Sequence, residues 1–294
     1  MRVFKSAILL AVLAVPLSAT RAEKPPLSLP KVGKWEVNYD VDSCHLLARF
    51  GAGANETVLS ITQTSPSDMF RVELFNPALA SKDILVPVKI SFDPQAAPIT
   101  RMGLTMTTGK TKMPLVMLED LRIDGVDSHK AANLPLPQIS PDRPAQVKSI
   151  TFKFPNVKAY RLETGSMAVP MQALRTCTDD LVVSWGFDPA VQAALFRRPI
   201  PASNPGNWLH DEDFPAKAAW AGHNGLIQFR LDVDTAGGVA NCRVLFRTDP
   251  DDFADQSCKV LIQRAKFSPA LDAKGQPVKS FYIGRIRFQA GGEW

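Results

Sequence analysis

The residue types best suited to chemistry are scattered along this sequence. The run His210-Asp-Glu-Asp213 brings an imidazole and three carboxylates together, a set that could bind a metal ion or exchange protons. Acidic residues beside a proline-rich segment are usually solvated, so we expect no metal there. The sequence has no G-x-S-x-G, no H-E-x-x-H and no G-K-[ST] after a glycine turn. We therefore expect no enzymatic activity and no cofactor. A catalytic triad assembled from distant residues stays an open alternative.

The first 22 residues have the pattern of a secretory signal peptide. A basic start precedes an apolar run of about 14 residues, and small residues follow at Ala19 and Ala22. That run is shorter than the roughly 20 residues that span a bilayer. We predict export, with an uncleaved membrane anchor through residues 6–19 as the alternative. Without residues 1–22 the chain has 31 basic against 29 acidic residues, a net charge of +2, which gives no basic surface for nucleic acid.

Export permits disulfides, and four cysteines are present: Cys44, Cys177, Cys242 and Cys258. They allow three pairings, and no C-x-x-C or Cys/His spacing indicates zinc. Cys242 faces inward from a predicted strand and Cys258 faces inward from the helix that follows, which favours a Cys242–Cys258 bridge. Cys177 lies on the apolar face of another predicted helix, where a bridge to Cys44 would join helix to sheet.

Residues 32–196 are predicted to form a β-rich N-terminal domain of unknown role. Apolar residues alternate with polar ones around 35–41, 70–74, 88–92 and 150–154, which indicates an antiparallel sheet or sandwich with one buried face. Near the end the spacing of Leu174, Cys177, Leu181 and Trp185 becomes helical, and Asp188-Pro189 begins a short helix. A proline-rich stretch at 133–145 is predicted to be a surface loop, and 197–211 a linker. We expect the tryptophans to pack in cores or between domains: Trp35, Trp185, Trp208 and Trp220.

Residues 212–294 are predicted to form a small α+β domain with the order strand, strand, helix, strand. Residues 225–233 form the first strand, and the turn Asp234-Thr-Ala-Gly237 leads to a second strand. In that second strand we expect Cys242, Val244 and Phe246 to share one face. An amphipathic helix follows Asp249-Pro250, and a final strand ends at Phe288.

The same region resembles the C-terminal domain of TonB, the periplasmic energy transducer. The shared elements are Phe214-Pro215, Gly225, the D-x-x-G turn, an amphipathic helix, R-x-x-F-x-P-A from Arg264 to Ala270, and G-x-P-V from Gly275 to Val278. Together they cover about residues 212–290. The resemblance implies a periplasmic protein without a small-molecule cofactor. Its implied partner is an extended protein segment, such as one from a TonB-dependent outer-membrane receptor.

In that family the C-terminal domain captures the partner by adding it to a sheet edge. Carried onto this sequence, the edge is the last strand, with Phe214 and Pro215 as a second contact. Its residues are Val278, Ser280, Phe281, Tyr282, Ile283, Arg285 and Arg287.

Two features depart from the energy transducers of that family. The apolar N-terminal segment has no histidine, and a β-rich domain stands where the family has a long linker of proline with charged residues. The sequence therefore also permits a cell-envelope binding or assembly module that keeps the fold without an energy-transducing role.

Overall fold

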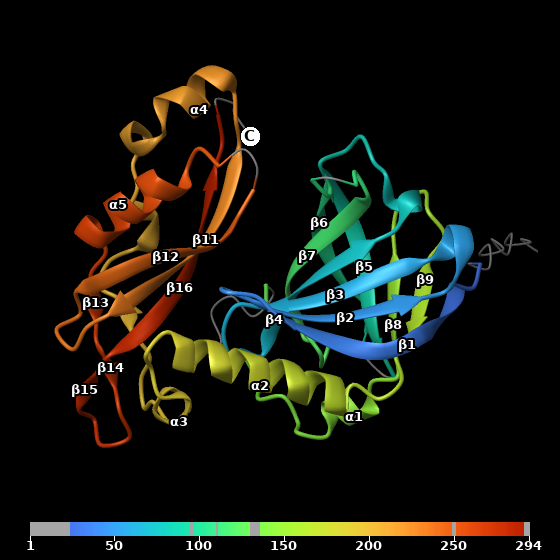
Figure 1. Ribbon diagram of the computed structural model, residues 1–294, viewed down its shortest axis with the longest axis horizontal. Coiled ribbons are helices and arrows are strands. Elements are labelled where there is room, and N and C mark those ends of the chain that lie inside the picture. Colours follow the sequence, from blue (N-terminus) through green and yellow to red (C-terminus); the bar gives the residue numbers. More distant parts are fainter. Residues whose placement is uncertain (1–23, 95–96, 110, 130–135, 249–250, 291–294) are drawn as a thin grey trace, which may run out of the picture.

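The computed structural model describes residues 24–94, 97–109, 111–129, 136–248 and 251–290, which form two units, each with its own core (Figure 1). The predicted signal segment, residues 1–22, and the predicted helix start at Asp249-Pro250 lie outside this range. Within the described residues, no helix has the length and apolar character needed to cross a membrane.

The N-terminal unit is a closed nine-stranded barrel with the strand order β1-β2-β3-β4-β7-β6-β5-β8-β9. Neighbouring strands are antiparallel, except that β1 pairs in parallel with β9 through Leu27–Pro30 and Tyr160–Glu163, which closes the barrel. The strands are β1 (Leu27–Tyr39), β2 (Cys44–Phe50), β3 (Thr57–Gln63), β4 (Met69–Phe75), β5 (Leu85–Asp93), β6 (Ile99–Thr107), β7 (Pro114–Arg122), β8 (Ser149–Lys153) and β9 (Tyr160–Glu163).

Side-chain alternation fills the barrel interior with apolar residues. Phe50, Phe92 and Phe152 point inward and are fully buried. The antiparallel strands with one buried face were predicted from this alternation, but the closure was not. Closure depends on pairing two segments more than 100 residues apart, which no local pattern indicates.

A long helix, α2 (Ala168–Ser184), runs along one end of the barrel (Figure 1). Its buried face includes Leu174, Cys177 and Leu181, as the spacing predicted, and Cys177 forms a disulfide with Cys44 of β2. Pro170 lies inside the first turn, where its missing N–H costs no helical hydrogen bond. The short helices are α1 (Arg143–Gln146), in the loop before β8, and α3 (Pro189–Ala193), which Asp188 caps.

The C-terminal unit is a three-stranded sheet, in the order β12-β11-β16, with a helix on one face. Its strands are β11 (Gly225–Val233), β12 (Val239–Arg247) and β16 (Ser280–Phe288), and its helices are α4 (Ala216–Ala221) and α5 (Ala254–Arg264). A Cys242–Cys258 disulfide joins β12 to α5, the second bridge that the sequence favoured.

Residues 197–211, expected to be a linker, are bonded to the C-terminal unit. Arg197 exchanges two backbone hydrogen bonds with Leu271, and β10 (Ile200–Pro201) pairs with β13 (Phe267–Ser268). Trp208 is only 2% exposed and packs in the C-terminal core. The prolines of this segment indicated a linker without regular structure, because proline has no backbone N–H to donate. A pairing of only two residues per strand, such as β10 with β13, needs few N–H donors and therefore forms despite the prolines. A further pair joins β14 (Ala270–Leu271) to β15 (Pro277–Val278).

Two predicted packing positions are wrong. Phe246 does not share a face with Cys242 and Val244, because a β-bulge opposite Gln228 and Phe229 adds one residue and turns Phe246 to the other face. There its ring lies 4.4 Å from the Arg71 guanidinium of the barrel. Trp220, expected in a core or between domains, is 92% exposed on α4.

Candidate partner-binding edge

Strand β16 is an edge strand among the described strands, where it pairs with β11 alone. Both backbone groups of Leu226 bond to Thr248, on the β12 side of β11. Backbone direction alternates along a strand, so Gly225, Ile227, Phe229, Leu231 and Val233 bond to β16. The intervening positions of β16 therefore point their N–H and C=O groups away from the sheet. These are Phe281, Ile283, Arg285 and Arg287.

No backbone group within the described part of the chain bonds to this open side of β16. Only the start of the strand is covered: the Gln192 side chain of α3 donates to the Lys279 carbonyl at 3.1 Å and accepts from the Ser280 hydroxyl at 2.6 Å. An edge with unpaired donors and acceptors can accept another strand. The open length runs from Phe281 to Arg287.

The predicted site residues of β16 divide between the two faces of the sheet. Tyr282 faces α5 and contacts Trp208 and Phe267, and burial raises the pKa of its hydroxyl. Phe281, Ile283 and Arg285 face the barrel, and Phe281 is buried there. Arg287 is exposed at the far end of the strand. A partner strand would therefore reach Phe281 only through its backbone groups, because that side chain is buried. Ser280 is outside this reach, because its side chain is buried and its backbone groups face Val233 of β11.

The other predicted residues lie beside this edge or away from it. Val278 belongs to β15 and pairs with Ala270, so it is not part of the β16 edge. Phe214 lies near the end of β16, where its ring packs edge-on against Phe288 at 5.7 Å. Pro215 precedes the first residue of α4. The structure thus brings Phe214 and Pro215 to one end of the edge, although Phe214 is part of the core.

Barrel residues at the face of β16 form the main site feature that the sequence did not reveal. Arg285 donates to Glu119 at 3.1 Å and to both carboxylate oxygens of Asp120, at 2.6 and 3.1 Å. Burial would raise the pKa of Asp120, but hydrogen bonds and charge attraction from Arg285 outweigh it and lower that pKa. His129 also bonds to Asp120, at 3.3 Å. Both carboxylates lie in β7, after the apolar run from Pro114 to Leu118, and the local sequence gave no signal of this role.

Aromatic contacts and a further ion pair also join the sheet to the N-terminal unit. Trp185, at the end of α2, packs edge-on against Phe281 at 5.2 Å, and the Arg230 guanidinium lies 4.3 Å from the Trp185 ring. On β12, Arg243 forms a two-point ion pair with Asp42 of the barrel. The sheet face is therefore joined to the barrel while the edge of β16 keeps free backbone groups.

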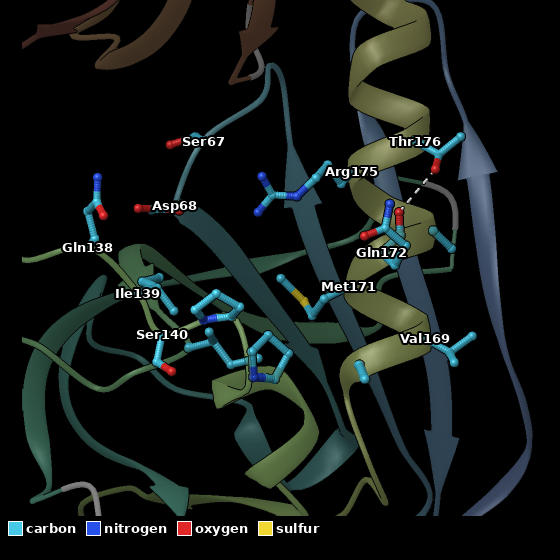
Figure 2. A pocket seen from close by; sticks show the side chains of 15 residues that line it. Ser67, Asp68, Gln138, Ile139, Ser140, Val169, Met171, Gln172, Arg175 and Thr176 are labelled. Atoms are coloured by element: carbon cyan, nitrogen blue, oxygen red, sulfur yellow. Dashed lines mark hydrogen bonds between the residues drawn. The ribbon is translucent and has the colours of Figure 1, made fainter. Parts of the chain in front are cut away.

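A larger groove lies elsewhere, between α2 and the loop that precedes α1, with a volume of about 1010 Å³. In Figure 2, Arg175 points from α2 toward Asp68, and Met171 and Ile139 supply apolar walls. The titratable pair Arg175 and Asp68 faces a lining that is otherwise amide, hydroxyl and apolar. Among the described residues that line the groove, Arg175 and Asp68 are therefore the titratable ones.

Two further clusters of polar side chains form hydrogen bonds within the protein. Ser43 and His45 lie 2.8 Å apart, a nucleophile–base distance, but the Ser43 side chain is buried and burial lowers the pKa of His45. In the predicted acidic run, Asp213 is not solvated: it is 6% exposed and bonds to Arg264 and to the His210 N–H. Among the described residues, no group of three or more histidine, cysteine or acidic side chains could hold a metal ion.

Comparison with known families places the edge in a recognised domain. Residues 211–290 match the family model described as Gram-negative bacterial TonB protein C-terminal. No curated protein and no solved structure matches the chain. The match covers the whole three-stranded sheet and α5, and leaves the barrel and α2 outside. Domains of this family are protein-interaction modules of the cell envelope.

Proposed function

We propose that this protein captures an extended segment of a partner protein at the bacterial cell envelope by adding that segment as a fourth strand beside β16. The proposal extends to TonB-dependent energy transduction, with an outer-membrane receptor segment as the partner. The observation that carries it is the open side of β16, from Phe281 to Arg287, within a domain that matches the TonB C-terminal family.

Strand addition would work through the backbone. Four residues of β16 offer outward N–H and C=O groups, and an extended partner satisfies them in a regular ladder. Each such bond contributes about 0.5–1.5 kcal/mol net, so several in a row give useful affinity without a deep pocket. Arg285 and Arg287 limit indiscriminate pairing, because charges on an edge strand disfavour association with apolar strands.

A second candidate function is an envelope assembly module that uses the same edge without transducing energy. The specific observation in its favour is the barrel, which is joined to the sheet by the Arg285–Asp120 and Arg243–Asp42 ion pairs and by the Trp185–Phe281 contact. A sheet fixed to a second folded unit suits a scaffold. An energy transducer of this family instead carries the domain on an extended spacer.

The experiment that tests the proposal uses the full chain in cells. A photo-reactive benzophenone amino acid replaces Arg287, whose exposed side chain lies beside the open edge. Irradiation should give an adduct that mass spectrometry assigns to an extended segment of an envelope protein. An outer-membrane receptor as the adduct supports the transport role, and a cell-wall enzyme or assembly factor supports the second candidate.

Two substitutions at Ile283 provide the matched control. Ile283→Pro removes an outward N–H that the β11 ladder does not use, a place where edge strands tolerate proline. Ile283→Ala shortens the same side chain and keeps the N–H. We expect the adduct to disappear with Ile283→Pro and to persist with Ile283→Ala. Equal adduct yields from the two folded variants would contradict capture along this edge.

A further inference from the structure

A small cleft lies between the barrel and the face of the sheet formed by β16 and β11. Its volume is about 220 Å³, below the roughly 300–1,000 Å³ of small-molecule sites, so its size suits one side chain. Ile283 and Arg285 form the sheet wall of the cleft, and Ser67, Glu119 and Asp120 form the barrel wall. The cleft therefore belongs to both units, and the TonB-like domain alone would have only one wall of it.

A strand added beside β16 would direct every second side chain toward this cleft. Residues directly opposite in paired strands lie about 4.5–5.5 Å apart and share a face. Ile283 and Arg285 face the barrel, so the guest residue beside them also faces the barrel. That guest side chain would then lie between β16 and the carboxylates of Glu119 and Asp120.

The charges of the cleft favour a cation at this position. Glu119 and Asp120 supply two carboxylates, and both are bonded to the single cation Arg285. The other arginine in the lining, Arg71, is bonded to Glu73 at 3.0 Å, and His129 lies 3.3 Å from a carboxylate oxygen of Asp120. The group of Glu119, Asp120 and Arg285 therefore carries two carboxylates against one guanidinium.

We propose that the barrel selects the guest segment by accepting a lysine or arginine side chain into this cleft, against Glu119 and Asp120. This inference rests on the proposed strand addition at β16 and names the chemistry of the partner. The barrel then contributes specificity, while β16 supplies backbone hydrogen bonds common to any extended segment. A side chain on the same face with a negative charge would meet two carboxylates and be excluded.

The test uses three synthetic nine-residue peptides of alternating threonine and valine that carry Lys, Gln or Glu at the central position. Their affinities for the full-length protein are measured by fluorescence anisotropy at low salt. We expect the Lys peptide to bind about fivefold more tightly than the Gln peptide, the upper size of a solvent-exposed charge pair, and the Glu peptide to bind most weakly. The preference for Lys should fall as salt is added.

A double-mutant comparison assigns the preference to the cleft. Glu119→Gln removes one carboxylate and leaves Asp120 to hold Arg285, and the Lys preference should shrink toward unity. The control Glu36→Gln changes an exposed carboxylate on β1, a strand not adjacent to β7, and should keep the preference. The peptides could lose binding with Ile283→Pro and yet show no preference for Lys. That result would refute selection by the cleft and leave the proposed strand addition supported. A failure of all three peptides to bind would overturn both.

Discussion

Two turns of the C-terminal unit have the same local structure, but one is packed against a neighbouring strand and the other faces open space. The two turns therefore allow the same substitution to be compared with and without a steric clash. Gly237 ends the turn between β11 and β12, and Gly275 ends the turn between β14 and β15, with φ angles of 86° and 77°. Each glycine N–H donates to the carbonyl of the aspartate three residues earlier, Asp234 or Asp272, at 3.1 and 3.0 Å. Each aspartate also accepts two backbone N–H groups.

Alanine at either position costs about 1–2 kcal/mol, because a left-handed conformation crowds its Cβ. At Gly275 no atom lies within 4 Å of the added Cβ, so the strained backbone conformation is the whole cost of the substitution. At Gly237 the Cβ would lie 1.9 Å from the Phe267 carbonyl oxygen, well inside the 3.0 Å that real contacts respect. Phe267 must then move by about an ångström, and its N–H bond to the Gly237 carbonyl is lost.

That lost hydrogen bond costs about 0.5–1.5 kcal/mol. Partial withdrawal of the buried Phe267 ring from Trp208 and Tyr282 costs about 1–2 kcal/mol more. We therefore expect Gly237→Ala to destabilise the C-terminal unit by about 2–3 kcal/mol more than Gly275→Ala. Hydrogen exchange at the β11 amides measures this directly, because it isolates one unit of a two-unit chain. Losses within about 0.5 kcal/mol of each other would refute the close approach to Phe267.

Two further predictions concern the disulfides and one buried acid. Replacing both Cys44 and Cys177 by serine should lower the free energy of unfolding by about 5 kcal/mol, against about 3 kcal/mol for Cys242 and Cys258, because their sequence separations are 133 and 16. Urea unfolding of each double variant checks that order, and the reverse order would contradict the loop-length argument. The His210 N–H and then Arg264 lower the pKa of Asp213, so ionised Asp213 stabilises the fold above the ordinary carboxyl pKa and loses that effect as pH falls through the lowered pKa. Asp213→Asn should therefore lower the melting temperature at pH 7 and have little effect once the pH is below the lowered pKa. Asp211→Asn changes an exposed neighbour and should leave the melting temperature nearly unchanged at both pH values.

Local patterns predicted most elements because they depend on short-range spacing. Leu174, Cys177 and Leu181 fix the face of α2, and Asp188 caps α3, as the sequence indicated. Both disulfides also follow from placing cysteines on apolar faces. Phe246 escaped prediction because one bulge residue reverses every later side chain of a strand. Trp220 escaped it because hydrophobicity favours burial without requiring it.

The candidate site divides in the same way. The sequence by itself determined that the last strand lies in a small α+β domain and carries arginines, since alternation and turn residues are local properties. Only the tertiary structure decided that β16 is an edge, that no described backbone group bonds to its outward side, and that Glu119 and Asp120 contact Arg285. Those carboxylates lie more than 160 residues before Arg285. The contact between these residues depends on how the two folded units pack against each other. The free energy of that packing is a sum over whole surfaces, so no short stretch of sequence predicts it.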